Sequence, residues 1–188
     1  MERFWPANRN KHNLEILLHR TAIKHARETP SSLKVFVSGF SSESVEVPCL
    51  SCCDGYCRDI PELCIDIEEA DTRIIPHALH AVEHGIQRRV VLSPDTDVFV
   101  LLLFYWDVLH EKGLYELWLK AGSGNSTKYI PIHSLASDKG PDLCKVLPAV
   151  HTLTGCDYTS KVGTKQAALK ANPVDYLQGF GCSQKWTF

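Results

Sequence analysis

A short apolar strand, an acidic turn and a long apolar run follow one another near the middle of the chain, and this order most constrains the fold. Residues 89–93 predict a buried strand, and residues 94–97, with the sequence Pro-Asp-Thr-Asp, form the loop after it. An apolar run over 98–106 comes next and predicts a helix. A strand that leads through a loop into a helix indicates an α/β protein.

The other predicted elements alternate along the chain. Helices are expected over 13–27, 69–84 and 142–152, with a short one inside 160–171; strands are expected over 33–37 and 45–47, and a hairpin joins 114–119 to 127–132. Residues 49–64 are interpreted as a Cys-rich loop. Pro76 is expected to kink its helix. No internal repeat is evident.

Size and composition fit one globular domain. The chain has 188 residues, of which 44% are hydrophobic and 22% charged, and these are values of an ordinary folded protein. The nine apolar residues of 98–106 fall far short of the roughly 20 that a membrane-crossing helix needs. The first residues contain no apolar signal core, so we expect an intracellular protein with no membrane partner.

Charge is unevenly distributed although the formal net charge is only −2. Residues 41–119 carry a net charge of −10, whereas 1–40 and 120–188 each carry +4. An acidic segment between two basic segments fits a cation-binding site that is flanked by residues able to bind phosphate. Ordinary solvated faces produce the same pattern, so charge alone leaves both interpretations open.

Five of the eight cysteines lie within residues 49–64. Without a signal peptide, free thiols or metal ligands are expected rather than a disulfide framework. Cys49, Cys52, Cys53 and Cys57 could supply four sulfurs to one Zn²⁺. True zinc ribbons place a dozen or more residues between their ligand pairs, so a Cys-rich loop without metal is the favoured alternative and Zn²⁺ is not the expected cofactor.

Three short acidic groups stand where an α/β fold exposes its sites. They begin a predicted helix, follow a predicted strand and follow another helix, and their members are Glu69, Asp71, Asp95, Asp97 and Asp157. Hard oxygen ligands favour Mg²⁺ or Mn²⁺, and two such ions would support phosphodiester hydrolysis. Each group alone is also explained as a helix cap or a turn. The combination is what predicts catalysis.

The same blocks carry a family resemblance. The strings EEADTRII, SPDTDVFVL and LTGCDYTSKVGTKQAALK are similar, in order and approximate spacing, to the PIN-like nuclease domain of the flap endonuclease and XPG superfamily. They also resemble a group of uncharacterised animal proteins, linked to mobile elements, that carry such a domain. The resemblance covers residues 66–172 and implies a three-layer α/β fold with a mainly parallel central sheet over 1–188.

The resemblance implies a structure-specific nuclease that uses two Mg²⁺ or Mn²⁺ ions to cut DNA or RNA, with DNA the expected substrate and the nucleus the expected location. The five acidic residues named above would be both the catalytic residues and the metal ligands. A helix-turn-helix-like segment over 154–172 would hold the duplex phosphates, through Lys161, Gly163, Lys165 and Lys170. A solvated helix face is the alternative for these lysines.

One departure from the family bears on activity. The family's first strand normally ends in an Asp, and another follows before the acidic helix, but no Asp precedes Asp54 in this chain. The sequence therefore predicts either an N-terminally incomplete PIN-like domain or a degenerate metal site. The alternative function is a non-catalytic module that binds nucleic acid or protein. A small zinc-binding interaction domain is a third hypothesis.

Overall fold

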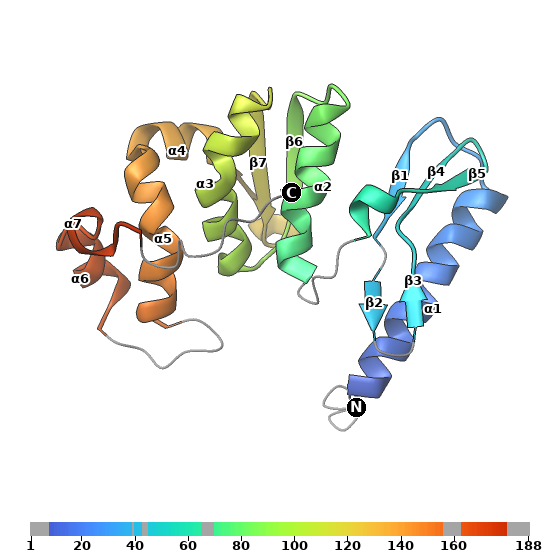
Figure 1. Ribbon diagram of the computed structural model, residues 1–188, viewed down its shortest axis with the longest axis horizontal. Helices are drawn as coiled ribbons and strands as arrows, with labels where there is room; N and C mark the ends of the chain where they lie inside the picture. Colours follow the sequence, from blue (N-terminus) through green and yellow to red (C-terminus); the bar gives the residue numbers. More distant parts are fainter. Residues whose placement is uncertain (1–7, 39, 43–44, 65–69, 156–162, 180–188) are drawn as a thin grey trace. The chain divides into compact units, whose positions relative to one another are not determined.

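The computed structural model describes residues 8–38, 40–42, 45–64, 70–155 and 163–179. The chain forms two compact units, Met1–Glu69 and Ala70–Phe188 (Figure 1). The family resemblance over 66–172 falls almost entirely in the second unit. Both units mix helices with strands, so the α/β expectation is confirmed in this general form.

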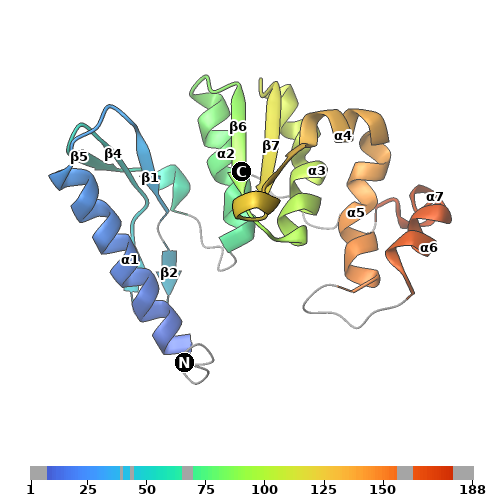
Figure 2. The same cartoon turned by 180° about the vertical axis from the view of Figure 1, so that it is seen from behind.

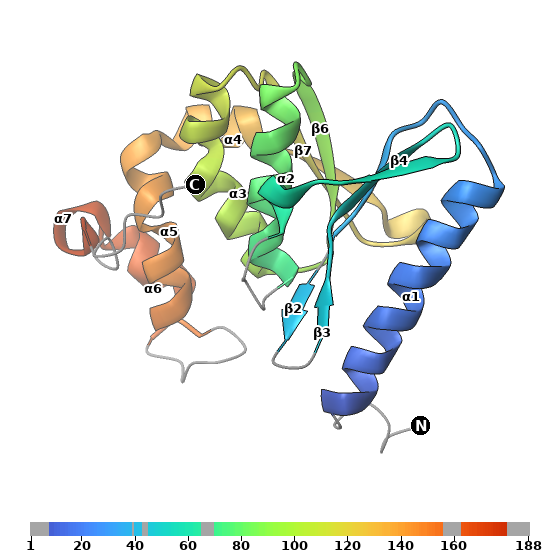
Figure 3. The same cartoon turned by 45° about the vertical axis from the view of Figure 1, so that its right-hand side comes forward.

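The first unit consists of one long helix and short antiparallel strands. Helix α1 (Asn8–Glu28) extends the predicted helix at both ends and packs on β1, β4 and β5 (Figure 3). Its described strands form two sheets, in the orders β1-β4-β5 and β2-β3. The strands are β1 (Val35–Val37), β2 (Phe40–Ser42), β3 (Val45–Val47), β4 (Leu50–Cys53) and β5 (Tyr56–Asp59), and a 3-10 turn η1 (Pro61–Leu63) follows them.

The Cys-rich segment is a β-hairpin, so its interpretation as a loop was wrong. β4 and β5 pair antiparallel, with Cys53 opposite Tyr56 next to the turn. Asp54 and Gly55 have positive φ angles of 50° and 81°. A two-residue turn with positive φ at both positions matches the twist of the flanking strands, and Asp-Gly is a preferred sequence for it. That dipeptide was the signal for the hairpin.

The second unit alternates helices and strands. Its elements in chain order are α2 (Ala70–Glu83), β6 (Arg88–Leu92), α3 (Thr96–Glu111), β7 (Glu116–Ala121), the 3-10 turn η2 (Gly124–Ser126), β8 (Lys128–Pro131), α4 (Ile132–Lys139), α5 (Pro141–Leu153), α6 (Lys165–Lys170) and α7 (Val174–Leu177). The predicted helices over 69–84 and 142–152 correspond to α2 and α5. The predicted hairpin is confirmed as β7 and β8.

One mixed sheet organises the second unit, with the strand order β6-β7-β8. β6 and β7 run parallel, and β8 returns antiparallel to β7. The larger, mainly parallel sheet that the resemblance implies is not present among the described residues. The sheet packs one face against the core, where Leu102, Leu109, Leu117 and Leu119 are almost completely buried.

The described helices cover only one face of this sheet. Figure 1 shows α2 and α3 in front of β6 and β7, and the reverse view in Figure 2 shows the strands in front of the helices. On β6, Val90 and Leu92 are 50% and 68% exposed. The prediction of a buried strand over 89–93 was therefore wrong for these side chains, because β6 is an edge strand of the described sheet and no described helix of the second unit covers its outer face.

Candidate functional site

The loop after β6 starts helix α3 and carries two of the predicted site residues. The Asp95 N–H donates to Ser93 Oγ at 3.1 Å, and the Asp97 N–H donates to Asp95 Oδ1 at 2.8 Å. Asp95 is therefore the N-cap of α3, with an extended backbone. Its side chain satisfies an N–H group that the first helical turn leaves without an intrahelical acceptor. The sequence alternative of a turn that caps the next helix is confirmed for Asp95.

Asp97 has a different partner, far away in the sequence. His151 Nε2 donates to Asp97 Oδ1 at 2.5 Å. The side chain of His151 is 10% exposed and that of Asp97 is 33% exposed, so the pair is largely shielded from solvent. Hydrogen bonds to a carboxylate are shorter and stronger than neutral ones. The contact connects the start of α3 to the last turn of α5.

His151 was missed as a site residue. It lies within the segment 142–152, which was interpreted only as a helix, and a single histidine in an amphipathic helix gives no local sign of its partner. Its burial places it among the few polar side chains inside the unit. Nearby, Thr154 is also buried, and its hydroxyl donates to the Val150 carbonyl oxygen at 2.6 Å. The same carbonyl oxygen also accepts the Thr154 N–H at 3.0 Å, so the hydroxyl adds a second bond at the end of α5.

Three acidic or polar element ends lie at the same end of the second unit. Figure 1 shows the beginning of α2, the beginning of α3 and the end of α5 at its lower end. Asp71, half-buried, lies in the first turn of α2. The carboxyl end of the parallel strand β6 leads into the same region through Asp95. In open α/β sheets, ligands bind beyond the carboxyl ends of the strands.

The described carboxylates do not by themselves form a metal site. In the parts of the chain that the structure describes, no group of three or more His, Cys, Asp or Glu side chains is placed to hold a metal ion. Glu69 and Asp157, two of the five predicted ligands, lie outside the described residues. Asp97 is brought together with His151, whereas Asp95 is engaged in capping α3.

The predicted nucleic-acid-binding residues are only partly described. Lys161 lies outside the described residues. Gly163 has a φ of 75° and precedes α6, whose N-cap Thr164 accepts a hydrogen bond from the Ala167 N–H at 3.2 Å. Lys165 and Lys170 are exposed. They lie five residues apart, so their side chains leave the helix about 140° apart around its axis. A single nucleic-acid backbone along one face of α6 would therefore not contact both lysines.

The four cysteines considered as zinc ligands do not gather. Cys52 and Cys57 face each other across β4 and β5 and form a disulfide. Cys53 follows Cys52 in the strand, and successive side chains point to opposite faces. Cys49 is buried, and its N–H donates to Cys64 Sγ at 3.2 Å. The prediction of free thiols was therefore wrong for Cys52 and Cys57, and the four-sulfur arrangement is not formed.

No family model, curated protein or solved structure matches this chain. None of the described helices has the length and apolar character needed to cross a membrane.

Proposed function

We propose that the second unit is part of a PIN-like nuclease domain that hydrolyses phosphodiester bonds of DNA or RNA with Mg²⁺ or Mn²⁺. The observation that carries the proposal is the bond between His151 and Asp97. The bond joins the end of α5, the helix that precedes Asp157 in the sequence, to the start of α3, where Asp95 and Asp97 lie. Contacts of this kind would bring carboxylates distant in sequence to one end of the sheet.

The proposed ligands are Glu69, Asp71, Asp95, Asp97 and Asp157, and His151 is a positioning residue. Two divalent ions, when bound, would activate water and stabilise the leaving oxygen. His151 binds Asp97 through Oδ1, which leaves the second carboxylate oxygen, Oδ2, to serve as the proposed metal ligand. Outer partners of this kind fix the orientation of ligating groups. The proposal includes a nuclear location.

A melting experiment separates metal binding from helix capping. Asp95→Ser keeps an N-cap oxygen but removes the carboxylate, and Asp97→Asn removes the second charge. Glu111→Gln, at the opposite end of α3, is the matched control. Saturating Mn²⁺ at a hundred times Kd adds about 2.7 kcal/mol, which raises the melting temperature of a unit of this size by about 10 °C. The rise should disappear in both site variants and persist in the control.

Cleavage is then measured on flap, hairpin and single-stranded substrates labelled with a fluorophore. Loss of either proposed ligand should lower turnover more than about 100-fold, because removing even an outer partner of a metal ligand typically costs about 10–100-fold. His151→Gln should lower turnover less than Asp97→Asn does, because it removes only the orienting bond. Unchanged turnover in Asp97→Asn, with folding intact, would contradict a nuclease centred on this loop.

The second candidate is a module that keeps the fold and binds nucleic acid without cutting it. It is favoured by the capping role of Asp95 and by the absence of a complete metal group among the described residues. Such a module should bind oligonucleotides without cleavage, and Asp97→Asn should keep or gain affinity because repulsion of phosphate falls. Lys165→Gln and Lys170→Gln should each reduce the salt dependence of binding if these lysines contact phosphates.

A further inference from the structure

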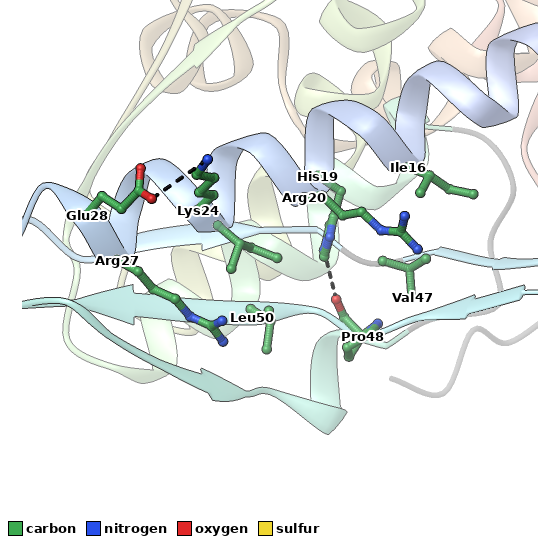
Figure 4. Close-up of a pocket in the computed structure, with 10 residues that line it drawn as sticks. Ile16, His19, Arg20, Lys24, Arg27, Glu28, Val47, Pro48 and Leu50 are labelled. Carbon is green, nitrogen blue, oxygen red and sulfur yellow. Dashed lines mark hydrogen bonds and ion pairs between the residues drawn. The ribbon is translucent and has the colours of Figure 1, made fainter.

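The first unit contains a pocket that the proposed nuclease chemistry does not use. It has a volume of about 510 Å³ and lies between α1 and the segment that leads from β3 into β4 (Figure 4). Its helix side runs from Ile16 to Glu28, and its strand side runs from Val47 to Leu50. A volume of this size is typical of ligand sites in proteins.

The lining combines an aliphatic floor with a cationic rim. Ile23, Val47 and Leu50 supply apolar surface, and Arg20 and Arg27 supply two guanidinium groups. Figure 4 shows the two arginine side chains extending from α1 toward the strand side of the pocket. They are seven residues apart, which is about two helical turns and about 10 Å along the axis. The two cations therefore lie on the same side of the helix.

Within the described part of the chain, no carboxylate pairs with the two rim arginines. Glu28 is the acidic side chain of the lining, and its Oε1 lies 3.8 Å from Lys24 Nζ. Among the residues that the structure describes, neither Arg20 nor Arg27 has a carboxylate within salt-bridge distance. An arginine fork binds a carboxylate or phosphate through two parallel hydrogen bonds. The rim is thus complementary to anionic groups spaced along an extended ligand.

A buried histidine fixes the two walls of the pocket. His19 is 8% exposed, and its Nε2 donates to the Pro48 carbonyl oxygen at 3.1 Å. Figure 4 shows this bond crossing from α1 to the strand side. Because the walls are joined before any ligand arrives, binding does not have to order them, which lowers its entropic cost.

The shape and the lining select among anionic ligands. From Ile16 to Glu28 the helix side is about 18 Å long, which matches five or six residues of extended chain. None of the described lining residues is Phe, Tyr or Trp, whereas sites for single-stranded nucleic acid stack bases on such rings. Aliphatic side chains, in contrast, fit the floor directly. We propose that this pocket binds an extended acidic peptide segment of a partner protein that also carries aliphatic side chains.

Fluorescence anisotropy on the full chain tests the proposal. The probe is a fluorescein-labelled hexapeptide of alternating Glu and Leu, and the comparison peptides replace every Glu by Gln or every Leu by Ala. The double variant Arg20→Gln/Arg27→Gln should weaken binding of the first peptide at least tenfold. The control Lys34→Gln/Arg58→Gln removes two exposed charges of the same unit that do not line the pocket, and it should change Kd less than twofold.

Three outcomes would overturn the proposal. In the first, the Gln peptide or the Ala peptide binds as tightly as the probe. In the second, the rim variant binds the probe as tightly as the parent chain does. In the third, a dodecamer of thymidine binds tightly, displaces the peptide and loses its affinity in the rim variant. That result would assign the pocket to nucleic acid instead. Circular dichroism of each variant shows that the comparison is made between folded proteins.

Discussion

Asp97 and His151 are 54 residues apart in the sequence, yet the imidazole Nε2 lies 2.5 Å from the carboxylate Oδ1. The bond holds the last turn of α5 against the first turn of α3, the two helices that flank the candidate site. It also leaves the buried imidazole with a polar partner, which a histidine at this depth requires. The pair therefore has a structural role whether or not a metal ion binds beside it.

Breaking this pair should destabilise the second unit. His151→Ala leaves Asp97 without its donor and opens space beside α3, so we expect the free energy of unfolding to fall by about 1–3 kcal/mol. Urea unfolding followed by circular dichroism measures the change. His84→Gln replaces an exposed histidine in the turn after α2 and should stay within about 0.5 kcal/mol of the parent. Equal effects of the two substitutions would show that the pair contributes nothing.

The turn between β7 and β8 should tolerate alanine at one glycine and reject it at another. Gly122 has a φ of 79°, and a Cβ there would lie 2.5 Å from the Ser126 carbonyl oxygen. Gly122→Ala should cost at least about 2 kcal/mol, because backbone strain adds to the clash. Gly124, with a φ of 52° and no atom within 4 Å of its added Cβ, should lose only about 1 kcal/mol. Thermal unfolding of the two variants gives the comparison.

The disulfide of the first unit can be detected chemically. Cys52 and Cys57 should resist alkylation until a reductant is added, and peptide mapping by mass spectrometry should recover them linked. Cys52→Ser/Cys57→Ser should lower stability by about 2 kcal/mol, the chain-entropy value for so short a loop. Cys144→Ser, a buried cysteine of the second unit, leaves the linkage intact. Alkylation of both cysteines in unreduced, folded protein would contradict the pairing.

Acid should destabilise the second unit through His77. Burial, and after it the positive charges of His80, Arg89 and Arg73, lower the pKa of His77 below its ordinary value of 6.5. The unfolded chain then takes up the proton at a higher pH than the folded protein does. The contribution of His77 to stability is therefore complete above about pH 6.5 and declines as the pH falls below that value.

His77→Gln tests this dependence. The loss of unfolding free energy between about pH 7.5 and about pH 5.5 should be smaller in the variant than in the parent chain, because glutamine takes up no proton. Urea titrations at the two pH values measure both losses. The comparison uses the loss of unfolding free energy between the two pH values, not the stability at either pH, because the substitution itself shifts the stability at every pH. A steeper loss in the variant would reverse the assigned sign.

Local patterns predicted the elements whose apolar periodicity is strong. The run over 98–106 lies inside α3, and the hairpin of β7 and β8 followed from two strand-like segments around a Gly-rich turn. The β4–β5 hairpin was missed because cysteine and polar side chains mask the alternation of short strands. The partner of Asp97 was missed for another reason. A contact between residues 54 positions apart depends on how α3 and α5 pack, and nothing local encodes it.

The parallel pairing of β6 with β7 has a kinetic consequence. Parallel neighbours cannot be joined by a tight turn, so the chain must complete the crossover through α3 before these two strands can meet. β7 and β8 need only close a short loop, which takes microseconds, whereas pairings between more distant segments carry a larger loop-closure entropy and form more slowly. The β7–β8 hairpin should therefore assemble first, and β6 should join its free side only after α3 has folded.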